Sequence, residues 1–339
     1  MLALLVTACT AVAPSGAVAR SAPESFSPLV KRVLPAVVNI AVTETISGGD
    51  VLAELPQELR DTPLGREFRR RFGNKHEQTL GAGSGFIIDA SGLIVTNNHV
   101  VGHADKIVVS MTDGKQYPAK VIGSDELTDV ALIRVVAPSP LPYVTWGDSQ
   151  KVEVGDWVLA AGNPFGLGGS VTAGIVSALG RDLGAGPFDN FLQLDAPINP
   201  GNSGGPIFNM EGQVVGVSTA IVSPSGGSVG IGFATPSELV IPIVAQLRGG
   251  GHIERGWLGV SVEDSDNGVT VAGVERGSPA ARAGIHQGDM ILSVNGDHVD
   301  TSRGLIRAVA AAPPGKDVNL SIADSSLELA KAVVSQYLK

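Results

Sequence analysis

Short apolar runs, separated by glycine-rich turns, recur along most of this 339-residue chain. Phe86–Ile88 and Leu93–Thr96 illustrate the pattern, because the Ala90–Gly92 segment between them has the composition of a tight turn. The chain contains 44 glycines and few long segments with helical periodicity, which favours many short strands over a helix bundle. The sequence therefore predicts a mainly β protein, and its length indicates two domains.

One serine stands out in the glycine-rich segment Asn199–Pro206, where Ser203 follows Gly201 and Asn202 and precedes two more glycines. Glycines let backbone N–H groups converge on one point, and a serine that attacks a carbonyl needs such donors for the oxyanion it creates. The N–H groups of Gly201 and Ser203 could supply them. Alone, the motif also fits a tight turn in a β protein, so the chemistry depends on a base and an acid elsewhere.

Candidates for the base and the acid are found where strands begin and end. His99 directly follows one apolar run, and Asp129 opens another, where neighbouring apolar residues would draw its carboxylate out of water. Asp125 lies in a polar cluster and is expected to be solvated. The order His99, Asp129, Ser203 is that of chymotrypsin, and it differs from the orders in subtilisin and the α/β-hydrolases.

The chain resembles the bacterial HtrA/Deg family of serine proteases in five stretches, which are Thr96–Val100, Thr128–Leu132, Gly162–Leu167, Val171–Ser177 and Gly201–Pro206. The resemblance implies a chymotrypsin-like double β-barrel that needs no cofactor or metal. It implies that His99 is the general base, that Asp129 orients it, and that Ser203 attacks the scissile carbonyl. The N–H groups of Gly201 and Ser203 would form the oxyanion hole.

The substrate pocket is expected to be small and aliphatic. Chymotrypsin-like enzymes that prefer basic residues carry a carboxylate six residues before the nucleophile, and here that position is Pro197. Ile198 and Ile221 are apolar too, so the pocket offers nothing to pair with a buried cation. Asp195 is the one acid close in sequence, and we interpret it as structural.

Two loops are expected to have regulatory roles. Residues 43–80 mix charged residues with proline and glycine and have poor periodicity, which is typical of a long loop that is functional or disordered. The resemblance places a regulatory loop here. The segment Asp182–Asn190 is rich in glycine, and the resemblance makes it a sensor loop that reorders on activation. Activation by a newly cut N-terminus is not expected, because Asn202 stands where digestive relatives have an aspartate.

The last third of the chain resembles a PDZ domain. A helix over Ser237–Arg248, with Ser237 as its N-cap, should close the protease domain. The resemblance to PDZ domains lies in Gly256–Val260, Gly277–Ala281, Ala283–Ile285 and Gly288–Gly296, with Thr301–Ala311 as the groove helix. Such a domain binds C-terminal peptides, here through the loop formed by Trp257, Leu258, Gly259 and Val260. After Ile322 the match fades, and Leu327–Leu338 fits a short amphipathic helix, so an incomplete PDZ fold remains open.

The predicted organisation has five parts: an export leader at 1–19, a trypsin-like protease domain at 20–248, a linker at 249–254, a PDZ-like domain at 255–322 and a helical tail at 323–339. The leader is inferred from the apolar Leu2–Val12 and the A-x-A sequence Ala17–Ala19. Cys9, the single cysteine, follows a sequence that resembles a lipoprotein box, so a lipid-anchored form is an alternative. Either reading predicts a periplasmic protein.

Charge and motif spacing exclude several other classes. The net charge is −9 and the pI is about 5.1, which argues against nucleic acid as a partner. A dinucleotide-binding protein is not expected, because the glycines of Gly81–Gly85 precede a strand, whereas dinucleotide binding needs a helix there. A zinc protease is not expected either, because no glutamate lies between His99 and His103 to complete its motif.

The resemblance implies that the partners are unfolded or misfolded proteins and C-terminal peptides. It also implies assembly into a homotrimer or larger oligomer through the N-terminal segment that contains Phe26. The alternative is a chaperone or peptide-binding scaffold in which proteolysis is secondary. The presence of all three catalytic residue types favours a serine endopeptidase that works without ATP.

Overall fold

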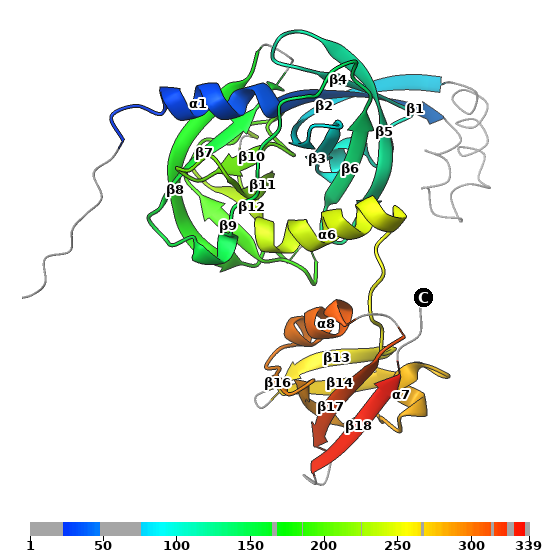
Figure 1. The fold of residues 1–339 in the computed structure, drawn as a ribbon. Helices are drawn as coiled ribbons and strands as arrows, with labels where there is room; N and C mark the ends of the chain where they lie inside the picture. Colours follow the sequence, from blue (N-terminus) through cyan, green and yellow to red (C-terminus); the bar gives the residue numbers. More distant parts are fainter. Residues whose placement is uncertain are drawn as a thin grey trace, which may run out of the picture.

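The computed structural model describes residues 23–47, 76–164, 168–184, 186–224, 226–265, 268–312, 315–323 and 329–335. Two closed barrels of six strands each lie side by side, and a smaller sheet domain follows them (Figure 1). The prediction of a mainly β double barrel with a smaller α+β domain is confirmed. The predicted export leader and Cys9 lie outside the described residues.

The first barrel has the strand order β1-β2-β3-β6-β5-β4. Its strands are β1 (Val37–Ser47), β2 (His76–Asp89), β3 (Leu93–Thr96), β4 (Lys106–Ser110), β5 (Gln116–Asp125) and β6 (Val130–Val135). All four residues of β3 are buried, as are five of the six in β6, because both strands pack on the barrel core. β1 and β2 pair as far as Ser47 and His76, so both ends of the segment expected to be a loop are strands.

The second barrel has the order β10-β11-β12-β9-β8-β7. Its strands are β7 (Trp157–Gly162), β8 (Ser170–Arg181), β9 (Phe191–Leu194), β10 (Pro206–Phe208), β11 (Val214–Ile221) and β12 (Gly232–Pro236). Ser203 lies three residues before β10, and the loop Asp182–Asn190 joins β8 to β9. The second barrel therefore presents both the serine loop and the expected sensor loop.

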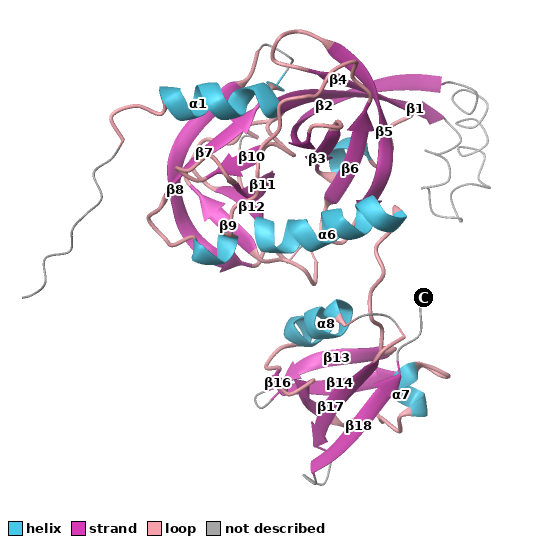
Figure 2. Cartoon of the chain, viewed as in Figure 1, coloured by secondary structure: helices cyan, strands magenta, loops and turns pink. Residues whose placement is uncertain are grey.

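Helices in the described part of the chain are short (Figure 2). They are α1 (Ser27–Val33), η1 (Leu34–Ala36), α5 (Asn98–Val101), η2 (Ser149–Lys151), α6 (Ser237–Gly250), α7 (Pro279–Arg282) and α8 (Ser302–Ala311). α6 packs against β5 and β6 of one barrel and β11 and β12 of the other. The predicted N-cap role of Ser237 is wrong, because Pro236 is the N-cap and the Ser237 hydroxyl donates to the Gly147 carbonyl. No helix in the described ranges is long and apolar enough to cross a membrane.

The smaller domain is a sheet of order β13-β14-β15-β17-β18, with β16 paired to β15. Its strands are β13 (Val260–Ser265), β14 (Gly268–Val274), β15 (Met290–Val294), β16 (Asp297–His298), β17 (Asp317–Ala323) and β18 (Leu329–Ser335). The predicted tail helix is wrong, because β18 pairs antiparallel with β17 over its whole length. Pairing satisfies an edge of β17 that a helix would leave open, and the final hairpin that the sequence left in doubt is present.

Candidate active site

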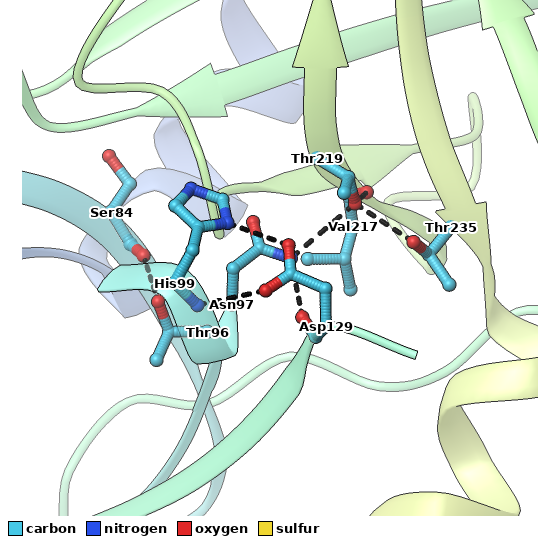
Figure 3. Close-up of polar contacts among 8 residues, drawn as sticks. All are labelled: Ser84, Thr96, Asn97, His99, Asp129, Val217, Thr219 and Thr235. Carbon is cyan, nitrogen blue, oxygen red and sulfur yellow. Dashed lines mark hydrogen bonds and ion pairs between the residues drawn. The ribbon is translucent and has the colours of Figure 1, made fainter. Parts of the chain in front are cut away.

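The topology of the first barrel brings His99 and Asp129 together. β3 and β6 are antiparallel neighbours, with Thr96 opposite Ala131, so the end of β3 lies beside the start of β6. His99 in α5 and Asp129 in the turn before β6 therefore meet (Figure 3). Asp129 Oδ2 lies 2.6 Å from His99 Nδ1, and Asp129 Oδ1 accepts a hydrogen bond of 2.8 Å from the His99 backbone N–H.

The backbone of Asp129 is held in an unusual conformation. Its φ of 53° lies in the left-handed region, which few residues other than glycine adopt. The Asp129 carbonyl accepts hydrogen bonds from the Asn98 N–H at 3.1 Å and from Asn97 Nδ2 at 2.8 Å, and these contacts stabilise the turn. A carboxylate on the Nδ1 side of His99 places the imidazole proton there and leaves Nε2 as an acceptor, as a general base requires.

The serine loop presents two backbone N–H groups beside its hydroxyl. Gly201 has a φ of 97°, a conformation that glycine adopts without steric cost. The N–H of Asn202 donates to the Asn199 carbonyl, and the N–H of Gly204 donates to Ser218. Among the described residues, the N–H groups of Gly201 and Ser203 have no acceptor, so both are available to a developing oxyanion.

The two barrels meet at the site. His99, Gly201 and Ser203 line one cavity of about 330 Å³. The base and the acid come from the first barrel, and the nucleophile and the oxyanion donors come from the second. The structure therefore brings together, in one place, the three residues that the sequence assigned to catalysis.

A pocket of about 400 Å³ begins at Ser203 and is lined by Ile198, Ala220 and Ile221. Two of the three predicted pocket residues, Ile198 and Ile221, therefore lie in it. Pro197 is not part of this lining, and its carbonyl instead accepts a hydrogen bond from Thr172.

Asp195, the acid nearest to this pocket in sequence, is bound to backbone. One of its carboxylate oxygens accepts a hydrogen bond of 2.6 Å from the Ile175 N–H. A carboxylate that is already engaged in holding β8 is poorly placed to pair with a substrate cation. This contact supports the structural interpretation of Asp195.

Another cavity, of about 340 Å³, is also lined by His99, together with Thr219, Leu183 and Phe188. Sequence reasoning missed Leu183 and Phe188 as candidate pocket residues. Both belong to the loop 182–190, so this loop forms a wall of the groove that leads to the base. No local pattern identifies such residues, because only the folded chain brings the loop to His99.

The segment expected to bind a peptide carboxylate lies directly before β13 and at its start. Gly259 has a φ of 77°, and a Cβ at this position would lie 2.3 Å from Ser278 Cβ, so glycine is required. Leu258 is buried in the domain core, and its carbonyl accepts a hydrogen bond from Ala280. Val260 begins β13, against which α8 packs. α8 (Ser302–Ala311) covers the predicted helix except for Thr301, which lies one residue before it as the N-cap and accepts from the Gly304 N–H.

Three arginines join the smaller domain to the protease domain. Arg303 forms an ion pair with Asp182. Arg307 donates to the Pro187 carbonyl at 3.0 Å and also to the Asp189 carbonyl. Burial, with a smaller contribution from nearby Arg303, lowers the pKa of the Arg307 guanidinium. The groove helix α8, which carries both arginines, thus contacts the loop 182–190 directly.

The third arginine, Arg255, corrects the expectation for Asp125. Its guanidinium makes two hydrogen bonds to the Asp125 carboxylate, at 2.8 and 2.5 Å, and lies 4.7 Å from the ring centroid of Phe188. Asp125 is 6% exposed, so it is buried and paired rather than solvated. Its partner is 130 residues away in sequence, and the polar cluster around Asp125 gave no sign of it.

The fold and the site define a serine peptidase of the trypsin-like class that carries a C-terminal PDZ domain. The family model for the trypsin-like peptidase domain matches residues 83–217, and the PDZ family model matches residues 256–326. The chain belongs to the HtrA/Deg family of serine endoproteases, as relatives and solved structures show.

DegP-like periplasmic serine endoproteases are similar to the chain over most of its length. The relative from Brucella suis biovar 1 is 45% identical, over 88% of this chain and 66% of the relative, and that from Halomonas elongata is 40% identical, over 92% and 70%. The chain thus spans 66% of the length of the Brucella relatives.

Solved structures of the family superpose well. The HtrA-type protease AlgW with decapeptide has a TM-score of 0.78 at 35% identity, and the match covers 93% of this chain and 99% of AlgW. The serine endoprotease from Yersinia pestis has a TM-score of 0.70 at 32% identity, covering 94% and 100%.

Proposed function

We propose that the protein is a serine endopeptidase that degrades unfolded or misfolded proteins of the cell envelope without ATP. The observation that carries the proposal is the shared cavity of His99 and Ser203, in which Asp129 orients the imidazole and two backbone N–H groups are free for the oxyanion. His99 Nε2 takes the proton of the Ser203 hydroxyl as the oxygen attacks the scissile carbonyl, and returns it to the leaving amine. Water then releases the acyl group by the same steps.

The test is degradation of casein by the purified protein and by its Ser203→Ala variant. Loss of the nucleophile should lower the rate by more than about a thousandfold, while circular dichroism and the melting temperature stay the same. A variant that keeps more than about a tenth of the activity would contradict the assignment. Light scattering on casein in the same experiment shows whether the inactive variant suppresses aggregation, which is what a chaperone or scaffold would do.

We propose that the protein acts in the periplasm, as the names of its DegP-like relatives say of them. A homotrimer or larger oligomer is the proposed assembly. Phe26 supports it, since its ring packs on Trp157 with centroids 5.7 Å apart, and Trp157 is 37% exposed. This pair forms an aromatic surface near the N-terminal segment that a second copy can cover.

We propose further that C-terminal peptides bound at Trp257–Val260 regulate cleavage through the loop 182–190. The support is the direct contact of Arg303 and Arg307 with that loop, whose Leu183 and Phe188 face the cavity next to His99. A peptide in the groove beside α8 can shift the loop only through its different affinity for the loop's two states. The AlgW structure with decapeptide shows that a relative binds a peptide.

A further inference from the structure

Ser84 in β2 makes four hydrogen bonds, two to the serine loop, one to Asn163 after β7 and one to Thr96 at the end of β3. It is fully buried. Its backbone N–H donates to the Ser203 carbonyl at 2.8 Å, and its hydroxyl donates to the Gly201 carbonyl at 2.6 Å. The same hydroxyl accepts from the Asn163 N–H at 2.8 Å. The Ser84 carbonyl accepts from the Thr96 hydroxyl at 2.7 Å, at the strand end that leads to the base (Figure 3).

Two of these contacts fall on Gly201 and Ser203, the residues that line the cavity and whose N–H groups have no acceptor among the described residues. In Gly201 and in Ser203, the N–H is the free oxyanion donor and the carbonyl is held by Ser84. The Gly201 carbonyl belongs to the peptide unit that joins Gly201 to Asn202, and the Ser203 carbonyl to the unit that joins Ser203 to Gly204, so the two contacts fix the peptide units that directly follow the two oxyanion donors. The backbone contact to Ser203 is possible for any residue at position 84, whereas the contact to Gly201 depends on the hydroxyl.

Packing leaves little room for a substitute donor around Ser84. A Cβ built on Gly204 would lie 2.3 Å from the Ser84 carbonyl oxygen, and one built on Gly162 would lie 3.0 Å from the Ser84 hydroxyl. Without the hydroxyl, the Gly201 carbonyl loses its donor and the Asn163 N–H loses its acceptor. Unsatisfied groups in a buried setting favour rearrangement of the backbone that carries them.

We propose that Ser84 is a positioning residue for the oxyanion hole. Its hydroxyl holds the Gly201 carbonyl, which fixes the peptide unit that follows Gly201 and so limits the backbone conformations of Gly201 to those in which its N–H is presented to the cavity shared with His99 and Ser203. Ser84 acts through the loop and touches no reacting atom. The inference rests on the peptidase activity proposed above and adds the element of the first barrel that fixes the oxyanion donors of the second.

The chain offers a matched control in Ser237. This serine is also fully buried, donates from its hydroxyl to the carbonyl of Gly147 at 2.7 Å, and accepts from the Ser149 N–H at 3.1 Å. The hydrogen-bond pattern is that of Ser84, but none of its partners belongs to the serine loop. Ser237→Ala therefore reports the general cost of losing a buried hydroxyl.

The experiment compares Ser84→Ala and Ser237→Ala in the full protein. With a peptide p-nitroanilide that has valine before the cleaved bond, Ser84→Ala should lower kcat about 10- to 100-fold at an unchanged KM. Ser237→Ala should leave both within about twofold of the unsubstituted protein. ¹⁹F NMR of the hemiketal formed with a peptide trifluoromethyl ketone gives a second readout. The pKa of the hemiketal hydroxyl should be higher in Ser84→Ala only, since weaker donors stabilise its anion less.

The possible outcomes distinguish a failure of the positioning role of Ser84 from a failure of the proposed peptidase activity. An unsubstituted protein that neither cleaves the peptide nor forms the hemiketal refutes the peptidase proposal itself. An active unsubstituted protein whose Ser84→Ala variant keeps its kcat and its hemiketal pKa refutes the positioning role. If Ser84→Ala does not fold, Ser84→Cys replaces it, because a thiol is a weak donor of similar shape. A Ser84→Cys variant with unchanged kcat per folded molecule equally refutes the inference.

Discussion

Asp129 binds His99 at two points, the ring Nδ1 and the backbone N–H. Asp129→Asn should therefore lower kcat by about 10⁴, the size of the effect of the corresponding change in chymotrypsin, because the amide stabilises the wrong tautomer of the imidazole. Steady-state kinetics on the p-nitroanilide peptide measure this. Asp113→Asn is the control, since Asp113 is an exposed aspartate paired with Lys115. Equal activity of the two variants would show that Asp129 does not orient the base.

Specificity is also decided by single residues. Ile198 and Ile221 line the pocket at Ser203 and offer no charge, so cleavage should follow Val, Ala or Ile rather than Arg or Lys, whose charge would be buried unpaired. Mass spectrometry of the products from an unfolded substrate identifies the residue before each cut. Enrichment of basic residues there would mean that the pocket has been placed wrongly.

Single residues also show how much of the candidate site could be predicted from the sequence. His99, Asp129 and Ser203 could be named because each lies in a local pattern of glycines or at a strand end. Leu183 and Phe188 could not, since their role depends on a loop reaching His99 from the other barrel. The pairing of Arg255 with Asp125 is equally non-local.

At the scale of elements, α8 links the peptide groove to the loop 182–190. Arg307→Ala removes two hydrogen bonds to the backbone of that loop. We expect a free C-terminal hydrophobic peptide to stimulate cleavage of an unrelated reporter in the unsubstituted protein, and to lose most of this effect in Arg307→Ala. Arg282→Ala is the matched control, because Arg282 also donates to a carbonyl, that of Gly277, within its own domain. Equal stimulation of the two variants would exclude α8 as the link.

The secondary-structure elements also show which predictions from the sequence were wrong and why. The sequence pattern Leu327–Leu338 fits a helix, but most of this segment is the strand β18, which pairs with β17. The sequence of one segment alone does not show that the edge of a distant strand is open for pairing. The mainly β class was predicted correctly because repeated short strands are local signals, whereas the double barrel and the helix near Thr301–Ala311 were implied by the family resemblance.

At the scale of the whole molecule, the smaller domain should be needed for efficient degradation. Deletion of residues 253–339 removes the peptide-binding loop and all three interdomain arginines. We expect the remaining protein to degrade unfolded casein more slowly, because it loses both the raised local substrate concentration and the contacts to the loop 182–190. Initial rates on casein, normalised to molecules labelled by a fluorophosphonate, test this. A rate equal to that of the full protein would exclude a role for the domain.

The division of the site between two barrels has a consequence for the life of the chain before it is folded. A barrel that forms alone holds either a histidine without a nucleophile or a serine without a base. Peptidase activity therefore requires that both barrels have formed and docked. A nascent or unfolded chain has no complete active site, so it cannot cleave itself or neighbouring proteins.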